Sequence, residues 1–215
     1  MKTGIIFDLD GTLLDTLEDL KDAVNYALAQ FDCPGRTARE VCSFVGNGVA
    51  KLIERALPGK ANDPDPKEVL AVYQTYYNAH CQVKTAPYPG ILDVLAVLGE
   101  KYPLAIVSNK PDVAVKSLCR LHFGDIYARG ETADCPRKPA ADMVLQTMEK
   151  LGLDSCIYVG DSEVDVQTAK NANVPCVSVT WGFRTQAQLQ EAGAEYFCHE
   201  AAQLPQIIEE IINGK

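Results

Sequence analysis

The sequence predicts a doubly wound α/β fold with a parallel sheet, into which a second, all-helical domain is inserted. Short apolar, β-branched runs alternate with helical patterns over most of the chain, as in parallel sheets covered on both faces by helices. This alternation stops between residues 15 and 86, where helical patterns occur without a convincing strand. Pro87, Pro89 and Gly90 mark its return. We therefore expect an α/β core from residues 1–14 and 87–215, and a helical domain from residues 15–86.

Each expected element rests on its own pattern of apolar residues. Short buried runs bounded by turn residues predict five strands, which are Gly4–Leu9, Leu104–Ser108, Ile126–Ala128, Cys156–Val159 and Cys176–Thr180. Apolar residues at helical spacing predict four core helices, which are Ile91–Lys101, Val113–Leu121, Ala140–Leu151 and Val164–Ala172. In the insert the same spacing predicts Leu17–Phe31, Val49–Leu57 and Lys67–Cys81, with a loop rich in Pro, Asp and Gly before the last of them.

Composition excludes several classes of protein. The 215 residues are 47% hydrophobic and 23% charged, which is typical of a folded globular chain. No apolar run is long enough to span a bilayer, so we expect no membrane partner. The apolar stretch at the N-terminus ends in Asp8 and Asp10 rather than in small residues, which indicates a cytoplasmic protein. A net charge of −9 argues against a nucleic-acid partner, because phosphate backbones are bound by clustered Lys and Arg.

The cysteines and histidines do not predict a disulfide framework or a zinc site. Eight cysteines are scattered without a CxxC spacing, and in a chain of this kind we expect reduced thiols that are mostly buried. The three histidines show no metal-ligand spacing.

Two carboxylates follow the first predicted strand. Asp8 and Asp10 come directly after Ile5–Phe7, at the carboxyl end of a strand, where parallel α/β sheets bind ligands. Two carboxylates forced together repel each other and favour a cation between them. Gly11 allows a sharp turn, and Thr12 offers a hydroxyl and an amide. The alternative is a plain turn, since Asp and Gly are common turn residues.

The next polar groups lie at the end of a strand and before a helix. Ser108 and Asn109 lie at the end of the strand that begins at Leu104 and just beyond it, and can either hold phosphate oxygens or cap the helix that begins near Pro111. Lys138 precedes a predicted helix; it can neutralise phosphate and hold a carboxylate, or it is simply an exposed lysine.

A further pair of acids follows the fourth predicted strand. Asp161 comes after Val159-Gly160, and Asp165 lies four residues later. Hard carboxylate oxygens suit Mg²⁺, which takes few protein ligands and keeps several waters. The alternative is a helix N-cap followed by a surface acid.

The order of these motifs, an aspartate pair, then Ser-Asn, then Lys, then Gly-Asp with a second Asp, resembles the haloacid dehalogenase (HAD) superfamily over essentially the whole chain. The insert is similar to the helical cap domain of that superfamily. The resemblance implies a Mg²⁺-dependent phosphatase in which Asp8 attacks phosphorus to form an aspartyl-phosphate. It implies that Asp10 protonates the leaving oxygen, later activates water, and ligates Mg²⁺ through its backbone carbonyl.

The same resemblance assigns the remaining groups. Thr12, Ser108, Asn109 and Lys138 are expected to hold the transferring phosphoryl group, which needs cations and donors arranged in advance. Mg²⁺ is expected at Asp8, Asp10, Asp161 and Asp165, with Asp165 supporting the metal site from behind the direct ligands. Members that cleave carbon–halogen bonds lack the second aspartate, so Asp10 argues against dehalogenation.

The insert indicates a substrate. Phe44-Val45-Gly46-Asn47-Gly48-Val49 opens a helix that carries Arg55, and backbone amides at such a helix start can bind an anion. The alternative is an ordinary loop with a solvated arginine. The passage is similar to the cap of phosphoglycolate phosphatases, as are Pro87-Tyr88-Pro89-Gly90 and Ser108-Asn109-Lys110-Pro111. Asn47 and Arg55 are therefore expected to contact substrate, and 2-phosphoglycolate is the first candidate.

Two departures from that family leave other substrates open. Ala141 stands where a proline is usual, and Thr16 where a serine is usual. Close relatives hydrolyse pyrophosphate, sugar phosphates or nucleotides with the same core. Arg184, after the last predicted strand, is a further candidate for substrate contact. The partner is in each case a small phosphorylated metabolite, and the sequence leaves monomer and homodimer both open.

Two other classes of function are less well supported. A sugar phosphomutase of this group has a histidine shortly after the first motif, where this chain has Leu17, Glu18 and Asp19. A non-enzymatic phospho-receiver domain also clusters acids, a hydroxyl and a lysine on a parallel sheet. Receiver domains are shorter, place the phosphorylated aspartate after a middle strand, and lack a helical insert near the N-terminus.

Overall fold

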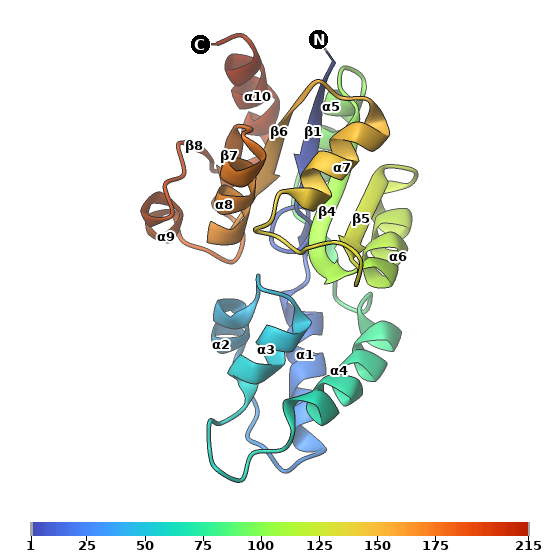
Figure 1. Cartoon of the computed structure of the whole chain (residues 1–215), viewed down its shortest axis with the longest axis vertical. Helices are drawn as coiled ribbons and strands as arrows, with labels where there is room; N and C mark the ends of the chain where they lie inside the picture. The colour runs from blue at the N-terminus through green and yellow to red at the C-terminus, as the bar shows by residue number, and fades with distance from the viewer. Residues whose placement is uncertain (1, 215) are drawn as a thin grey trace. The chain divides into compact units, whose positions relative to one another are not determined.

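A computed structural model describes residues 2–214 of the chain (Figure 1). The chain divides into two compact units, of which the first comprises Met1–Leu14 with Pro87–Lys215 and the second Asp15–Ala86. Two short strands, β2 (Leu14–Asp15) and β3 (Ala86–Pro87), pair where the chain passes from one unit to the other.

The first unit is built on a six-stranded sheet whose described ladders are all parallel. Its strands are β1 (Thr3–Phe7), β4 (Leu104–Pro111), β5 (Tyr127–Glu131), β6 (Ser155–Gly160), β7 (Cys176–Val179) and β8 (Tyr196–Cys198), in the order β5-β4-β1-β6-β7-β8. The order reverses at β1, which pairs with β4 on one side and with β6 on the other. In open α/β sheets ligands bind at this switch point, beyond the carboxyl ends of the strands.

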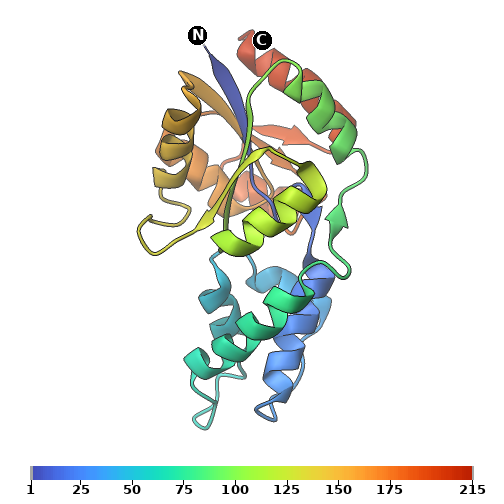
Figure 2. The same ribbon diagram turned by 90° about the vertical axis from the view of Figure 1, so that its right-hand side faces the viewer.

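Helices cover both faces of this sheet. The helices of this unit are α5 (Ile91–Gly99), α6 (Asp112–Phe123), α7 (Asp142–Leu151), α8 (Glu163–Ala172), α9 (Gln186–Glu191) and α10 (Leu204–Ile212), with a 3₁₀ turn at Ala201–Gln203. Ile5 and Phe7 pack with α5, α6 and α10, whereas Ile6 between them packs with α7 and α8. Figure 2 shows α5 and α10 side by side on the first of these faces. The alternation of strand side chains thus builds two apolar layers around one sheet.

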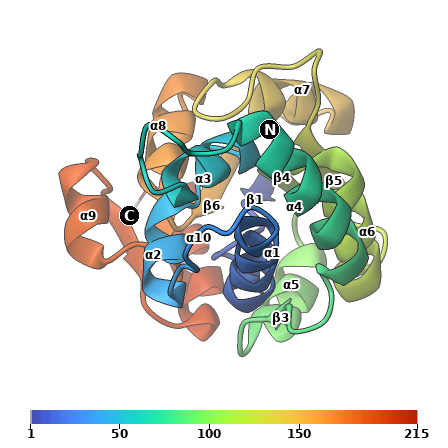
Figure 3. The same ribbon diagram turned by 90° about the horizontal axis from the view of Figure 1, so that it is seen from below.

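The second unit contains four helices, α1 (Leu17–Ala29), α2 (Ala38–Phe44), α3 (Val49–Ala56) and α4 (Pro66–His80). Helix α1 packs on α2 and α4, and α3 also packs on both of them (Figure 3). Their apolar faces enclose a separate core that includes Leu20, Val24, Ile53 and Tyr73. This unit therefore has its own hydrophobic interior.

The predicted fold class is confirmed, with differences at particular elements. Helix α7 begins at Asp142 rather than at Ala140, because Ala140 closes a turn onto the carbonyl of Arg137. Strand β5 continues to Glu131 beyond its expected end. Helices α2, α9 and α10 and strand β8 were not among the predicted elements. The first residues of α2 and α9 could have been predicted from the sequence, because Thr37 with Glu40 and Thr185 with Gln188 form capping boxes there.

Within residues 2–214, none of the helices has both the length and the apolar character that crossing a lipid bilayer requires.

The buried thiols are expected to be chemically inert in the folded protein. All eight cysteines lie within the described residues and none forms a disulfide. Burial raises the pKa of Cys119 and Cys156 to about 12, so their reactive thiolate forms are scarce at pH 8. We expect iodoacetamide to leave both unmodified in the native protein and to modify both in urea, as measured by peptide mass mapping. Native Cys119 that reacts as fast as the half-buried Cys33 would contradict this prediction.

Candidate active site

The loop after β1 places two aspartates at the switch point of the sheet. The backbone N–H of Asp8 donates to the carbonyl of Val159 at 2.8 Å, which continues the pairing of β1 with β6. The chain then folds back, because the N–H groups of residues 12–14 all donate to the carbonyl of Leu9. Gly11 lies in this loop with φ of +83°, and a Cβ there would stand 2.3 Å from Oδ2 of Asp161. A glycine is needed at this position on both counts.

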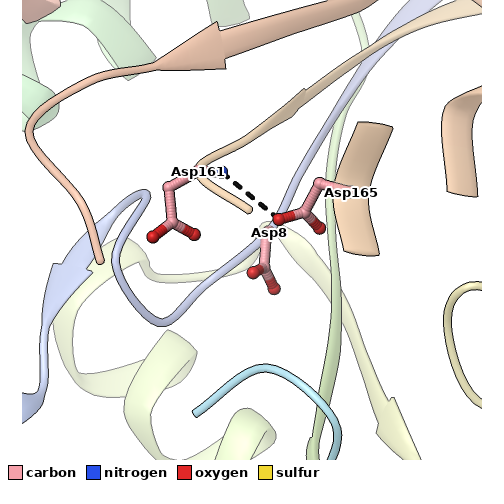
Figure 4. A group of neighbouring side chains, drawn as sticks. All are labelled: Asp8, Asp161 and Asp165. Atoms are coloured by element: carbon pink, nitrogen blue, oxygen red, sulfur yellow. Dashed lines mark hydrogen bonds between the residues drawn. The ribbon is translucent and has the colours of Figure 1, made fainter. Parts of the chain in front are cut away.

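Three buried carboxylates gather at this point. Each of Asp8, Asp161 and Asp165 offers an oxygen, and these atoms all lie within 4.8 Å of one another. Figure 4 shows the three side chains and the hydrogen bond from the backbone N–H of Asp161 to Asp165. Asp8 follows β1, Asp161 follows β6 and Asp165 stands in the first turn of α8. The order of motifs in the sequence therefore corresponds to a cluster in space.

A buried lysine holds two of these carboxylates. Nζ of Lys138 lies 2.9 Å from Oδ1 of Asp8 in an ion pair, and donates to Oδ1 of Asp165 at 2.8 Å and to the hydroxyl of Tyr158 at 2.9 Å. Burial on its own would lower the pKa of Lys138, but the carboxylates of Asp165 and Asp8 raise it well above its ordinary value. Lys138 is therefore a charged side chain in the interior, and the alternative of an exposed lysine is wrong.

Asn109 fixes the backbone of this lysine. Its side-chain amide donates to the carbonyl of Lys138 at 2.9 Å and accepts from the N–H of Lys138 at 2.8 Å. The buried hydroxyl of Ser108 accepts from the N–H of Lys110 at 3.3 Å. The two side chains do not cap the following helix, because β4 runs on through Pro111 and α6 begins at Asp112.

Asp165 supports the cluster from behind. Its Oδ1 accepts from Lys138 and, at 3.2 Å, from the hydroxyl of Tyr158. Its Oδ2 accepts from the N–H and hydroxyl of Ser162 at 3.1 and 2.6 Å, and from the N–H of Asp161 at 3.3 Å. Asp165 is thus fully buried and its oxygens are occupied by donors of the chain, so it is not a surface acid.

Asp161 is held by a loop that follows β7. The backbone N–H of Phe183 donates to its Oδ2 at 2.6 Å, and the hydroxyl of Thr12 donates to its Oδ1 at 3.4 Å. The indole N–H of Trp181 donates to the carbonyl of Thr12 at 3.0 Å, which ties this loop to the loop after β1. A Cβ on Gly182 would lie 2.3 Å from the carbonyl oxygen of Gly11 and 2.4 Å from Cβ of Asp161.

The charges of the cluster are not balanced by the chain. Lys138 pairs with Asp8 and Asp165, and the third carboxylate, Asp161, has only the weaker influence of Arg184 against it. Burial raises the pKa of Asp8 to about 7, with Lys138 opposing this shift and Asp165 adding to it. Burial, together with Asp165 and Asp8, raises the pKa of Asp161 well above its ordinary value. Carboxylate oxygens with excess negative charge fit a hard divalent cation such as Mg²⁺.

Asp10 differs from the other acids of the predicted metal set. Its carboxylate is not part of the cluster of Asp8, Asp161 and Asp165. Both of its oxygens instead accept from Nζ of Lys110, at 2.8 and 3.0 Å. The expectation that Asp10 meets a metal through its backbone carbonyl rather than its side chain stays a prediction.

Lys110, Tyr158 and Ser162 are residues of the site for which no role was predicted from the sequence. Lys110 stands inside the quoted Ser-Asn-Lys motif, so a readable signal existed. Tyr158 had no such signal in the sequence, because an aromatic residue within an apolar strand looks like an ordinary core residue. Ser162 directly follows Asp161 and is the N-cap of α8, where it forms a capping box with Asp165.

Arg184, Asn47 and Arg55 have structural partners or surroundings that the sequence did not reveal. Nε of Arg184 lies 2.7 Å from Glu163 in an ion pair, and the arginine side chain is buried. Asn47 lies in the loop between α2 and α3, flanked by two glycines with positive φ. Arg55 is exposed, and its guanidinium donates to the carbonyl of Phe44 at 2.9 Å. Contact of these residues with substrate stays a prediction.

Gly182→Ala is expected to weaken Mg²⁺ binding at the acidic cluster by about 10-fold to 100-fold, the usual effect of disturbing a group that orients a metal ligand. The added methyl group collides with Asp161 and with the backbone of Gly11, so the carboxylate must move. Isothermal titration calorimetry with MgCl₂ measures the change in affinity. Gly99→Ala is the matched control, because its Cβ would stand 3.6 Å from the nearest side chain. A folded Gly182→Ala variant with unchanged Mg²⁺ affinity would contradict the prediction.

Comparison with known proteins identifies what this chain is similar to. The sequence model of the haloacid dehalogenase-like hydrolases matches residues 5–179. A phosphoglycolate phosphatase of Agrobacterium fabrum is 33% identical over 97% of this chain and 93% of its own length. One of Neisseria meningitidis is 32% identical over the same shares of the two chains. A crystal structure from Lactobacillus delbrueckii subsp. bulgaricus, described as a candidate phosphoglycolate phosphatase, is 37% identical and superimposes with a TM-score of 0.89 over 97% of this chain and 99% of its own.

Proposed function

Because this chain belongs to the family of haloacid dehalogenase-like hydrolases and is a phosphoric monoester hydrolase, we propose that it hydrolyses 2-phosphoglycolate with Asp8 as the nucleophile. The observation that carries the proposal is the buried carboxylate of Asp8, paired with Lys138 and placed beside Asp161. The named activity of the relatives at 33% and 32% identity supports the choice of substrate.

In the first step Asp8 attacks the phosphorus atom. The ion pair with Lys138 holds Oδ1 of Asp8, which assigns the attack to Oδ2. The new bond joins this oxygen to phosphorus, and the bond from phosphorus to the ester oxygen breaks. We assign Asp10 as the acid that gives its proton to the departing oxygen. The aspartyl-phosphate and glycolate are the products of this step.

In the second step water attacks the aspartyl-phosphate. Asp10, now ionised, takes the proton of the water, so that phosphate leaves and the carboxylate of Asp8 is restored. Asp10 thus returns to its protonated form, and the cycle balances in protons. The same residue serves both steps because its two protonation states alternate.

The groups around Asp8 bind and orient the phosphoryl group. Lys138 supplies a fixed positive charge, and we assign the hydroxyls of Thr12 and Ser108 to the phosphoryl oxygens. Asn109 was expected there too, but its side chain holds the backbone of Lys138, so we assign it to positioning this lysine. Mg²⁺ held by Asp8 and Asp161 would supply positive charge that stabilises the phosphoryl oxygens in the transition state.

We further assign Asn47 and Arg55 to the part of the substrate beyond the phosphate. A guanidinium suits the carboxylate of 2-phosphoglycolate. The hydrogen bond from the guanidinium of Arg55 to the carbonyl of Phe44 orients this side chain within its own unit. We also propose a cytoplasmic location, which keeps the eight thiols reduced.

The experiment that tests this function is Mg²⁺-dependent phosphate release from a panel of esters. The panel contains 2-phosphoglycolate, sugar phosphates, nucleotides and pyrophosphate, each compared by kcat/KM. We expect 2-phosphoglycolate to rank first and EDTA to abolish release. A higher rank for another ester would keep the phosphatase and replace the substrate. No release from any of them in the presence of Mg²⁺ would overturn the proposed function.

A further inference from the structure

We propose that Lys110 is a positioning residue that fixes the carboxylate of Asp10 for proton transfer. The inference rests on the proposed function, because it gives Lys110 a purpose only if Asp10 exchanges protons with the leaving group and with water. Neither the motifs that resemble the family nor the contacts around Asp8 indicate that Lys110 positions Asp10.

The contact between the two side chains is close and buried. Nζ of Lys110 donates to Oδ1 of Asp10 at 2.8 Å and to Oδ2 at 3.0 Å. The side chain of Lys110 is 2% exposed and that of Asp10 13% exposed. An ion pair buried to this degree is weak support for stability, because well-packed apolar residues often replace such pairs without loss. A role in holding the carboxylate explains why a charged lysine stands there.

An irregularity in β4 brings Lys110 to Asp10. The ladder with β5 pairs Val107 with Arg129 and then Pro111 with Glu131, so four steps along β4 match two along β5. Such bulges re-aim side chains and are frequent beside active sites. The bulged residues include Lys110, and the preceding Asn109 holds the backbone of Lys138.

Gly130 on β5 allows this bulge to pack closely. A Cβ at Gly130 would lie 2.6 Å from the carbonyl oxygen of Lys110 and 2.5 Å from Cα of Asp112. The N–H of Gly130 also donates to Oδ1 of Asp112 at 2.9 Å. The backbone that carries Lys110 is therefore held from the neighbouring strand.

Each aspartate of the first motif thus has its own lysine. Lys138 contacts the nucleophile Asp8, and Lys110 contacts Asp10. Two N–H···O bonds to one carboxylate restrict its rotation, whereas a single bond leaves it free to turn. Misplacement of a reacting group by about 1 Å can cost about 100-fold in rate, so this restraint has a measurable consequence.

A double-mutant cycle between Lys110 and Asp10 tests the inference. We compare wild type, Lys110→Met, Asp10→Asn and the double variant by kcat/KM for 2-phosphoglycolate, or for the best ester of the panel. Lys110→Met is expected to reduce kcat/KM by about 100-fold in the wild-type background and by less than about 3-fold in the Asp10→Asn background. A residue that acts through Asp10 loses its effect once Asp10 can no longer exchange protons. Equal losses in both backgrounds, or no loss in either, would overturn the inference.

The leaving group provides the second readout. Glycolate leaves as a basic alkoxide and needs a proton, whereas p-nitrophenolate leaves readily without one. On p-nitrophenyl phosphate we expect Lys110→Met and Asp10→Asn each to reduce kcat/KM by less than about 5-fold. Because kcat/KM includes only the steps up to the first irreversible one, later hydrolysis of the aspartyl-phosphate does not enter.

These readouts separate the two hypotheses. If Asp10→Asn affects both esters equally, the role of Asp10 in the proposed function is wrong. If Asp10→Asn reduces kcat/KM far more on 2-phosphoglycolate than on p-nitrophenyl phosphate and Lys110→Met does not, only the inference on Lys110 is wrong.

Lys116→Met is the matched control, because this lysine is 65% exposed on α6 and pairs with Asp112. If Lys110→Met does not fold, Lys110→Arg tests the same point. Arginine keeps two donors for Asp10, so it should stay closer than about 10-fold to wild type on both esters, and a 100-fold loss on 2-phosphoglycolate alone would contradict the inference.

Discussion

Asp8→Asn is expected to reduce phosphate release from every active ester by about 10⁴-fold or more, because an amide is not a nucleophile and no aspartyl-phosphate forms. The substitution is nearly isosteric, so the buried loop after β1 keeps its hydrogen bond to Val159. Among the predictions for this chain it has the largest effect on activity.

The same substitution is expected to stabilise the metal-free protein at pH 8. Burial raises the pKa of Asp8 from 3.8 to about 7, so between these values the folded chain holds a proton that the unfolded chain has released. Stability of the wild type therefore falls as pH rises through this window, and the loss is complete above about pH 7. Asn resembles the protonated form and removes this penalty, although it also loses the ion pair with Lys138. We expect a net gain of about 1–3 kcal/mol at pH 8 that shrinks toward pH 4.

Both effects are measurable on one preparation. Phosphate release with Mg²⁺ gives the loss of activity, and urea unfolding in EDTA at pH 5 and pH 8 gives the change in stability. Asp125→Asn is the control, since this aspartate is exposed in the turn before β5. Activity of Asp8→Asn within 10-fold of wild type would reject Asp8 as the nucleophile. A loss of stability at pH 8 would show that the ion pair with Lys138 outweighs the cost of burying the charge.

Much of the fold was readable because buried strands and amphipathic helices have different periods. The continuous apolar runs at Ile5–Phe7 and at Cys156–Val159 do not suit the surface, so they predict buried strands. Parallel strands end at the same edge of a sheet, so acids that follow them come together there. Asp8, Asp161 and Asp165 were therefore placed together from the sequence. Their proposed roles in catalysis stay predictions.

Other parts of the site depend on long-range packing that a local pattern does not carry. Taken alone, Lys138 looks like an exposed lysine; the order of the motifs assigned it to the site, but its burial follows only from the neighbouring Asn109, Tyr158 and Asp165. Lys110 turns toward Asp10 because of a bulge against β5, which follows from the register of two strands and from Gly130. Phe183 holds Asp161 through its backbone N–H, a donor that every residue except proline offers, so the residue type carries no signal. Such contacts are visible only in three dimensions.

Lys138→Met is expected to give the largest loss of stability, about 3–5 kcal/mol in the absence of metal at neutral pH. The methyl thioether fills a similar volume but leaves the carboxylates of Asp8 and Asp165 buried without their ammonium partner. Breaking one partner of a buried ion pair is costly because the remaining charge has neither water nor a counter-charge. Urea unfolding in EDTA measures the loss, with the exposed Lys116→Met as control.

Mg²⁺ then distinguishes a general packing defect from a missing charge. A divalent cation at the cluster restores positive charge, so added MgCl₂ should stabilise Lys138→Met by more than it stabilises wild type. Lys138→Met with Asp165→Asn should recover part of the stability in EDTA, because one buried charge is removed. If Mg²⁺ shifts both proteins equally and the second substitution adds to the loss, the destabilisation comes from packing. If both compensate, the cluster is a site whose charge is set for a cation, with Lys138 supplying only part of the positive charge that the three carboxylates need.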